Sequence, residues 1–166
     1  WTVEIIPSEI RPPPHTTGSA SGNRIRLAER ERVTNAGNLA DVVLAFNEMA
    51  LLSRIQAGSL ADDVLVLIDD QWATHDVEAY QVSYRKVLAQ ARERGATIVE
   101  VPLEKETLRH VEDAQQGKNM FAVGLLCALY TKDAGLLEGV ISGIFKGKSR
   151  EVIDTAVELA GAGYRY

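Results

Sequence analysis

The apolar positions between residues 40 and 101 form three short runs separated by amphipathic segments. Each run is rich in Val, Ile and Leu, which is typical of strands buried on both faces of a parallel sheet. We expect these strands over 41–46, 64–68 and 96–101. Helical periodicity predicts helices over 48–56 and 77–94, each followed by a glycine. The alternation of strands and helices favours a mostly parallel sheet covered by helices.

The regions on either side of this core have different patterns. Alternating β-branched residues predict strands over 1–6 and 23–27, which could add an antiparallel or mixed edge. Prolines and small polar residues separate these two strands. The last third of the chain has helical spacing, over 104–113, 119–130, 134–145 and 149–160. The expected fold is therefore a three-layer α/β domain with a mostly parallel central sheet and a helical C-terminal half.

Polar residues at three helix starts suit the N-cap position, where a side-chain oxygen accepts a hydrogen bond from a free backbone N–H. Asn47 is the expected cap of the helix at 48–56, and Asp76 the expected cap of the long helix that follows. Asn119 is the expected cap of the apolar helix at 119–130.

Composition excludes several classes of function. The chain is 46% hydrophobic and 25% charged, with a net charge of -5. This acidic balance argues against a general nucleic-acid binder, which needs excess Lys and Arg. The longest apolar run, at 120–130, is shorter than the roughly 20 residues that span a bilayer. The one cysteine, Cys127, excludes an internal disulfide and indicates a reducing, cytoplasmic setting.

Most candidate reactive residues have a structural interpretation as well. Asp69 and Asp70 follow a predicted buried strand, where they could bind a metal or act as base and acid, or could lie in a solvated loop that caps the next helix. The histidines, His15, His75 and His110, lack the spacing of a zinc site. Cys127 lies in an apolar helix, so we expect an inert thiol.

Two further features concern charge. Arg24 and Arg26 share one face of a predicted strand, where they could pair with carboxylates or meet a partner. Lys118 stands directly before a predicted helix, where a cation opposes the helix dipole. An anion shared between this lysine and the free N–H groups would explain the position. The alternative is a tolerated surface lysine.

Four stretches together resemble the gamma region of 2-oxoacid:ferredoxin (acceptor) oxidoreductases, and most of all the N-terminal part of the 2-oxoglutarate oxidoreductase alpha subunit. They are SEIRPPPHTTGSASGNRIRL at 8–27, AFNEMALLSR at 45–54, GKNMFAVGLLCALY at 117–130 and AGYRY at 162–166. The resemblance covers nearly all of the chain in the family's order.

Two departures from that pattern stand near the N-terminus. The resemblance implies an N-terminal strand and a glycine-rich turn that precede Trp1 in relatives, so we expect a single gamma domain over 1–166 that lacks this segment. Arg11, Pro12 and Pro13 stand where many relatives have an Arg-Gly-Gly turn.

The resemblance also implies a function. The whole enzyme oxidatively decarboxylates a 2-oxoacid with thiamine diphosphate, Mg²⁺, an iron–sulfur cluster and coenzyme A, and passes electrons to ferredoxin or a similar acceptor. The gamma region is implied to be an accessory domain that packs on the catalytic domains or subunits and has no catalytic residue of its own. Lys118, with Asn119 as helix cap, is the candidate contact to coenzyme A phosphate. The alternatives are an assembly module without ligand contact and an unrelated small α/β enzyme using Asp69 and Asp70.

Overall fold

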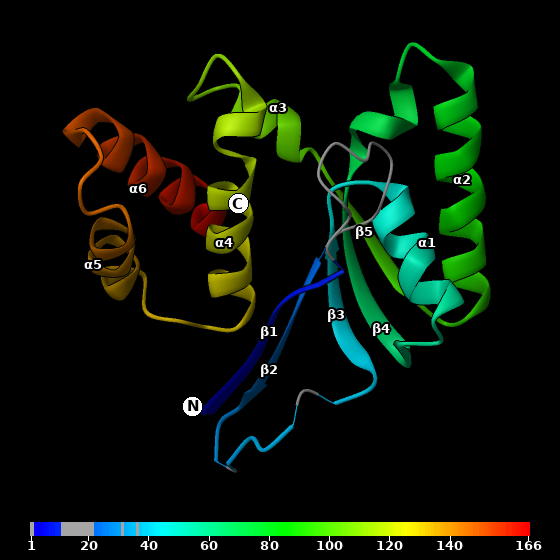
Figure 1. Ribbon diagram of the computed structural model, residues 1–166. Helices are drawn as coiled ribbons and strands as arrows, with labels where there is room; N and C mark the ends of the chain where they lie inside the picture. The colour runs from blue at the N-terminus through cyan, green and yellow to red at the C-terminus, as the bar shows by residue number, and fades with distance from the viewer. Residues whose placement is uncertain (1, 11–21, 31, 36) are drawn as a thin grey trace. The chain divides into compact units, whose positions relative to one another are not determined.

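The computed structural model describes residues 2–10, 22–30, 32–35 and 37–166. The chain divides into two compact units, residues 1–101 and residues 102–166. Each unit has its own secondary structure, α/β in the first and helical in the second (Figure 1). The α/β class and the helical C-terminal half are therefore confirmed, and a single gamma domain over the whole chain stays a prediction.

A parallel three-stranded sheet forms the centre of the first unit. Its strands are β3 (Ala40–Ala45), β4 (Leu60–Asp69) and β5 (Thr97–Val101), in the order β3-β4-β5 with both pairs parallel. The helices α1 (Glu48–Gln56) and α2 (Glu78–Glu93) connect them and lie on the same side of the sheet (Figure 1). The sequence predicted this βαβαβ arrangement, because two parallel strands must be joined by a crossover segment. The helices α1 and α2 are these crossover segments.

Among the described strands of this sheet, the central strand β4 is the most deeply buried, and Leu65 alone in its apolar run is partly buried. Val66 and Ile68 are fully buried and Leu67 is nearly so, and these side chains point to alternate faces of β4. Val99 on β5 is exposed, and β3 is half-buried along most of its length. The prediction of three doubly buried strands was therefore wrong for the two strands at the edges, each of which has a neighbour on one side only.

Helix termini follow two of the local predictions and contradict a third. Asn47 Oδ1 accepts a hydrogen bond from the Ala50 N–H at 2.9 Å, which confirms the cap of α1. Gly95, with φ of +87°, ends α2, and a Cβ there would lie 2.4 Å from the Asp62 carbonyl oxygen. The Asp76 prediction was wrong, because α2 begins one residue later and Val77 occupies its N-cap without a side-chain bond. The Val77 N–H donates instead to His75 Nδ1 at 3.1 Å.

The first two strands form a sheet of their own. β1 (Thr2–Ile10) and β2 (Gly22–Ala28) pair antiparallel in a two-stranded sheet, rather than extending the edge of the parallel one. Arg24 donates to the Gly37 carbonyl at 2.6 Å, and Arg26 donates to the Asn35 side-chain oxygen. Both arginines thus stabilise the segment that follows β2. The segment of prolines and small polar residues at 11–21, which the sequence placed between the two strands, lies outside the described residues.

Helices make up the second unit: α3 (Leu103–Thr107), α4 (Lys118–Leu129), α5 (Ala134–Ile144) and α6 (Arg150–Arg165), with a 3-10 turn, η2 (Ala114–Gln116). Helix α3 is shorter than the predicted 104–113, and Asp113 caps η2 by accepting from the Gln115 N–H at 2.9 Å. Within the described parts of the chain, no helix is long and apolar enough to cross a membrane.

Helices α4 and α6 cross at very short distance. A Cβ on Gly124 would lie 1.9 Å from the Ala160 carbonyl oxygen, and one on Gly163 would lie 1.9 Å from the Phe121 carbonyl oxygen. Both contacts are with backbone atoms, which cannot rotate away as a side chain can. The two glycines therefore set the closest approach of α4 and α6 and define the core of this unit.

Candidate functional site

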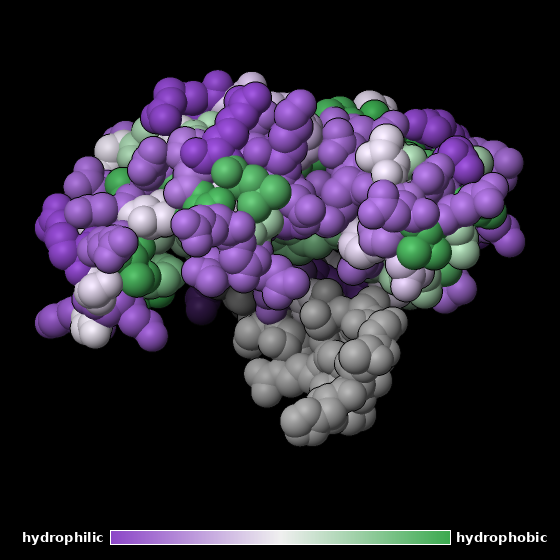
Figure 2. Space-filling view, turned by 90° about the horizontal axis from the view of Figure 1, so that it is seen from above, coloured by the Kyte–Doolittle hydropathy of each residue, from purple (hydrophilic) through white to green (hydrophobic). Residues whose placement is uncertain are grey.

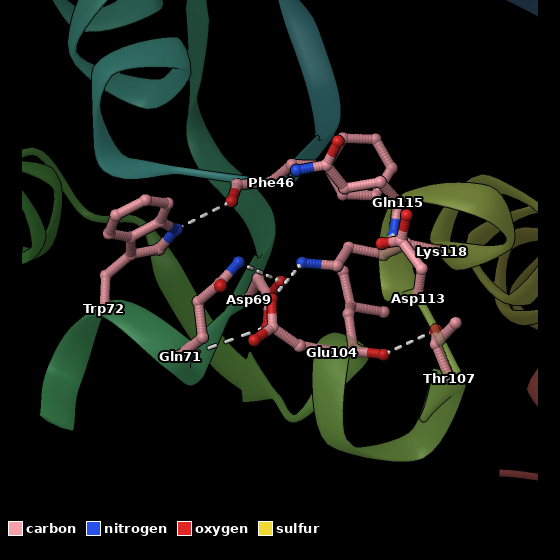
Figure 3. A network of polar contacts seen from close by, with 10 residues as sticks. Phe46, Asp69, Gln71, Trp72, Glu104, Thr107, Asp113, Gln115 and Lys118 are labelled. Carbon is pink, nitrogen blue, oxygen red and sulfur yellow. Dashed lines mark hydrogen bonds and ion pairs between the residues drawn. The ribbon is translucent and has the colours of Figure 1, made fainter. Parts of the chain in front are cut away.

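Lys118 forms an ion pair within its own unit. It is the first residue of α4, and its Nζ lies 3.0 Å from Glu104 Oε2 in the first turn of α3 (Figure 3). The lysine side chain is 14% exposed and the glutamate side chain 40% exposed. Partial burial reduces the screening of this pair by water and salt. Glu104 is thus a carboxylate partner of Lys118 within the second unit, and an anion shared with the N–H groups of the helix start stays a prediction.

The predicted cap at this helix start was wrong. Gly117 occupies the N-cap of α4, no side chain accepts a hydrogen bond there, and Asn119 is the second helical residue. A Cβ on Gly117 would lie 2.3 Å from Leu159 Cδ1 on α6. Close packing against α6 therefore favours glycine at this position, and Lys118 is inside the helix rather than before it.

The sequence offered little sign of the pair between Glu104 and Lys118. The two residues are 14 positions apart, and the intervening segment is irregular apart from the end of α3 and η2. Thr107 Oγ1 donates to the Leu103 carbonyl at 2.7 Å within α3. The chain then returns through η2 to the start of α4. A carboxylate in the first turn of a short helix was the available signal, since that position also favours the helix dipole.

Asp69 and Asp70 do not form an exposed acidic pair. Asp69 has no exposed surface and accepts hydrogen bonds from the Gln71 backbone N–H at 3.5 Å and from Gln71 Nε2 at 2.8 Å (Figure 3). It caps the 3-10 turn η1 (Asp70–Thr74), whereas α2, the helix that the loop was expected to cap, has no side-chain cap. The solvated environment was also wrong for Asp69. Among the residues that the structure describes, no group of three or more His, Cys, Asp and Glu is arranged to hold a metal.

An aromatic cluster lies where β3 and β4 end, and sequence reasoning missed it. Trp72 Nε1 donates to the Phe46 carbonyl at 2.9 Å (Figure 3). The His75 ring stacks on Trp72 with centroids 5.3 Å apart, and the Tyr80 ring meets both edge-on. This is the sheet edge where parallel α/β proteins place ligands. Here the aromatic residues stabilise the connection between β4 and α2.

The remaining candidates are separate from one another. His110 Nδ1 lies 2.9 Å from Glu158 Oε1 in the second unit, His75 belongs to the aromatic cluster of the first, and His15 is outside the described residues. Cys127 is half-buried, and desolvation raises the pKa of its thiol, with Lys132 acting weakly in the opposite direction. A raised pKa lowers the thiolate fraction, in agreement with an inert cysteine.

Comparison with known proteins identifies the family. Residues 13–166 match the family model for pyruvate ferredoxin/flavodoxin oxidoreductase. The chain belongs to this family. The match includes both units of the structure, and it confirms the resemblance to 2-oxoacid oxidoreductases.

One curated relative adds detail. The chain is 31% identical over 169 aligned residues to 2-oxoglutarate oxidoreductase subunit KorA of Mycobacterium tuberculosis. The alignment covers 96% of this chain and 25% of that protein. The chain therefore spans about a quarter of the length of this relative.

Proposed function

We propose that this chain is the gamma domain of a thiamine-diphosphate-dependent 2-oxoacid:ferredoxin oxidoreductase that acts on 2-oxoglutarate. The observation that carries the proposal is the family match over residues 13–166. The choice of 2-oxoglutarate is supported by the name of the relative that aligns along nearly the whole chain. The complete enzyme would convert a 2-oxoacid and coenzyme A to acyl-CoA and CO₂, and would transfer two electrons to ferredoxin or a similar acceptor.

The cysteine count of the chain and the arrangement of its described residues argue against a site here for the iron–sulfur cluster or Mg²⁺ of that reaction. One cysteine cannot by itself hold an iron–sulfur cluster, which takes about four thiolates. No His, Cys, Asp and Glu cluster suited to Mg²⁺ occurs among the described residues. Thiamine diphosphate, Mg²⁺ and the cluster would therefore be held by the catalytic domains or subunits, and this domain would act as their accessory.

The proposed ligand contact of this domain is between Lys118 and a phosphate of coenzyme A, with Asn119 in the same helical turn. A cation at the start of α4, where the helix dipole is positive, favours an anion. The proposal requires the ammonium group of Lys118 to bind a phosphate oxygen in addition to, or in place of, the Glu104 carboxylate. It can therefore be tested by changing the two partners separately.

The test uses the complete enzyme, with the Michaelis constant for coenzyme A as the readout. Lys118→Ala removes the cation, whereas the matched control Glu104→Gln breaks the ion pair but keeps the cation. A phosphate contact predicts a higher constant for Lys118→Ala and an unchanged or lower one for Glu104→Gln. Unchanged kinetics for Lys118→Ala would remove coenzyme A contact from the proposal.

A second candidate function is an assembly module with no ligand contact. The observation in its favour is that Lys118 already has a carboxylate partner in its own unit, at 3.0 Å. Under this alternative, both substitutions would lower the stability of the enzyme by similar amounts and leave the Michaelis constant for coenzyme A unchanged.

The overall activity has a direct assay. The complete enzyme, supplied with 2-oxoglutarate, coenzyme A and a viologen dye as electron acceptor, should reduce the dye and form succinyl-CoA. The chain of 166 residues alone should not do so with added thiamine diphosphate. Absence of turnover with 2-oxoglutarate and with other 2-oxoacids in the complete enzyme would refute the proposed function.

A further inference from the structure

Helix α5 presents an apolar face that the second unit leaves exposed. Its inner side packs through Ile141, which is buried in a cluster with residues of α6. On its outer side Leu136, Val140 and Ile144 are 67%, 56% and 74% exposed. Glu138 is the one charged residue of this helix. On the face that Figure 2 draws, hydrophobic residues form small patches within a mainly hydrophilic surface.

The three exposed side chains form a continuous stripe. Leu136, Val140 and Ile144 follow each other at intervals of four residues, which places them along one side of a helix. The stripe is about 12 Å long, from the rise of about 1.5 Å per residue. A row of large apolar side chains of this length is a typical contact surface for another protein segment.

Two glycines beside the stripe, Gly139 and Gly143, are not required by packing against any residue that the structure describes. Gly124 and Gly163 are required by the close crossing of α4 and α6, where a Cβ would meet backbone atoms. At Gly139 and Gly143 an added Cβ would meet nothing within 4 Å. Glycine weakens a helix relative to alanine. A backbone that approaches α5 as closely as α4 approaches α6 would account for these two positions.

The stripe continues into a basic loop. Lys146 and Lys148 lie in the loop after Ile144 and Phe145, and Arg150 begins α6; all three are exposed. Gly147 turns this loop with φ of +102°. Arg150 is paired with Asp154 on α6 at 2.9 Å, so the two lysines carry most of the charge available to a partner. Such a basic end on a chain of net charge -5 favours an acidic counterpart.

We propose that the exposed face of α5, with the loop at 145–149, docks against the remainder of the same oxidoreductase. The partner surface would be apolar at its centre and acidic where it meets Lys146 and Lys148. This inference rests on the proposed function, since the aligned relative is about four times longer than the region it shares with this chain. Its additional chain has the length to supply such a surface.

The first test is photo-crosslinking in the complete enzyme. The photoreactive residue p-benzoylphenylalanine replaces Ile144, and in a matched control it replaces Val82, an exposed residue of α2 in the first unit. We expect the probe at Ile144 to crosslink to a peptide outside residues 1–166 that carries acidic residues, in higher yield than the control. A crosslink to a second copy of this chain, a crosslink to lipid, or a yield no higher than that of the control would overturn the proposal.

The second test weakens the contact without changing the probe. Gly143→Leu and Lys148→Glu, each combined with the probe at Ile144, should lower the crosslink yield several-fold. Lys86→Glu, an exposed charge reversal on α2, should leave the yield unchanged. An unchanged yield in both test variants would overturn the proposed surface. Turnover of 2-oxoglutarate separates the failure of the two proposals. Normal turnover by the probe-bearing enzyme without a crosslink above the control refutes the docking surface alone. Absence of turnover by the unmodified enzyme refutes the proposed function.

Discussion

Lys118 and Glu104 join the start of α4 to the first turn of α3 through an Nζ to Oε2 distance of 3.0 Å. The lysine that looks unfavourable at a helix N-terminus therefore has a carboxylate partner in its own unit. This relationship makes a structural role for Lys118 measurable independently of any ligand.

The pair should show a coupling free energy of about 1 kcal/mol in a double-mutant cycle, because it is only partly exposed. The cycle uses Lys118→Met, Glu104→Gln and the double variant, with the free energy of unfolding measured in urea. Lys118→Met keeps most of the methylene packing while removing the charge. Single effects that add to within about 0.3 kcal/mol would contradict an energetic role for the pair.

Gly124→Ala should destabilise the chain by about 1–3 kcal/mol, since the new methyl group would overlap the Ala160 carbonyl oxygen and force α4 and α6 apart. The matched control is Gly143→Ala on α5, where space for a methyl group is open. In the isolated chain this control should be stabilising by about 0.5–1 kcal/mol through helix propensity. Thermal unfolding of both variants measures the difference, and equal effects would exclude a tight α4–α6 crossing.

Asn47→Ala should cost about 1 kcal/mol of stability, because the Ala50 N–H loses its side-chain acceptor at the start of α1. Asp76→Ala is the control, since α2 has no side-chain cap, and we expect a change below about 0.5 kcal/mol. Chemical denaturation of the two variants tests the assignment. A larger loss for Asp76→Ala than for Asn47→Ala would reverse it.

Alkaline pH should destabilise the first unit through Tyr84. Burial, together with the hydrogen bond that its hydroxyl donates to Glu100 Oε2 at 3.0 Å, raises the pKa of Tyr84 far above its ordinary value. The unfolded chain then loses this proton first, so the stabilisation is complete below about pH 10 and declines as the pH rises further.

Tyr84→Phe isolates this effect. It removes one hydrogen bond and should cost about 1 kcal/mol at neutral pH. The free energies of unfolding of the wild type and the variant should then converge as the pH rises above about 10. A difference that stays constant up to pH 11 would show that Tyr84 ionises as readily in the folded state as in the unfolded one.

Local sequence patterns determined much of the secondary structure. The apolar run of β4, the Asn47 cap of α1 and the glycine after α2 each depend on neighbouring residues, so their roles could be predicted from the sequence. The family was also predictable, because its motifs are continuous stretches in a fixed order. The unusual position of Lys118 was also evident from local sequence, because its charge opposes the dipole of the helix that it begins.

Tertiary structure decided which of these features act together. The sequence did not show that Glu104 is a partner of Lys118. It also did not show that Trp72 Nε1 donates a hydrogen bond to the Phe46 carbonyl, or that β1 and β2 form their own sheet. Nor did it separate Gly124, which lies against a backbone, from Gly143, which lies in open space. The physical reason is that capping, dipole and periodicity effects act between residues close in the chain, whereas ion pairs and helix crossings depend on distances that only the folded backbone sets.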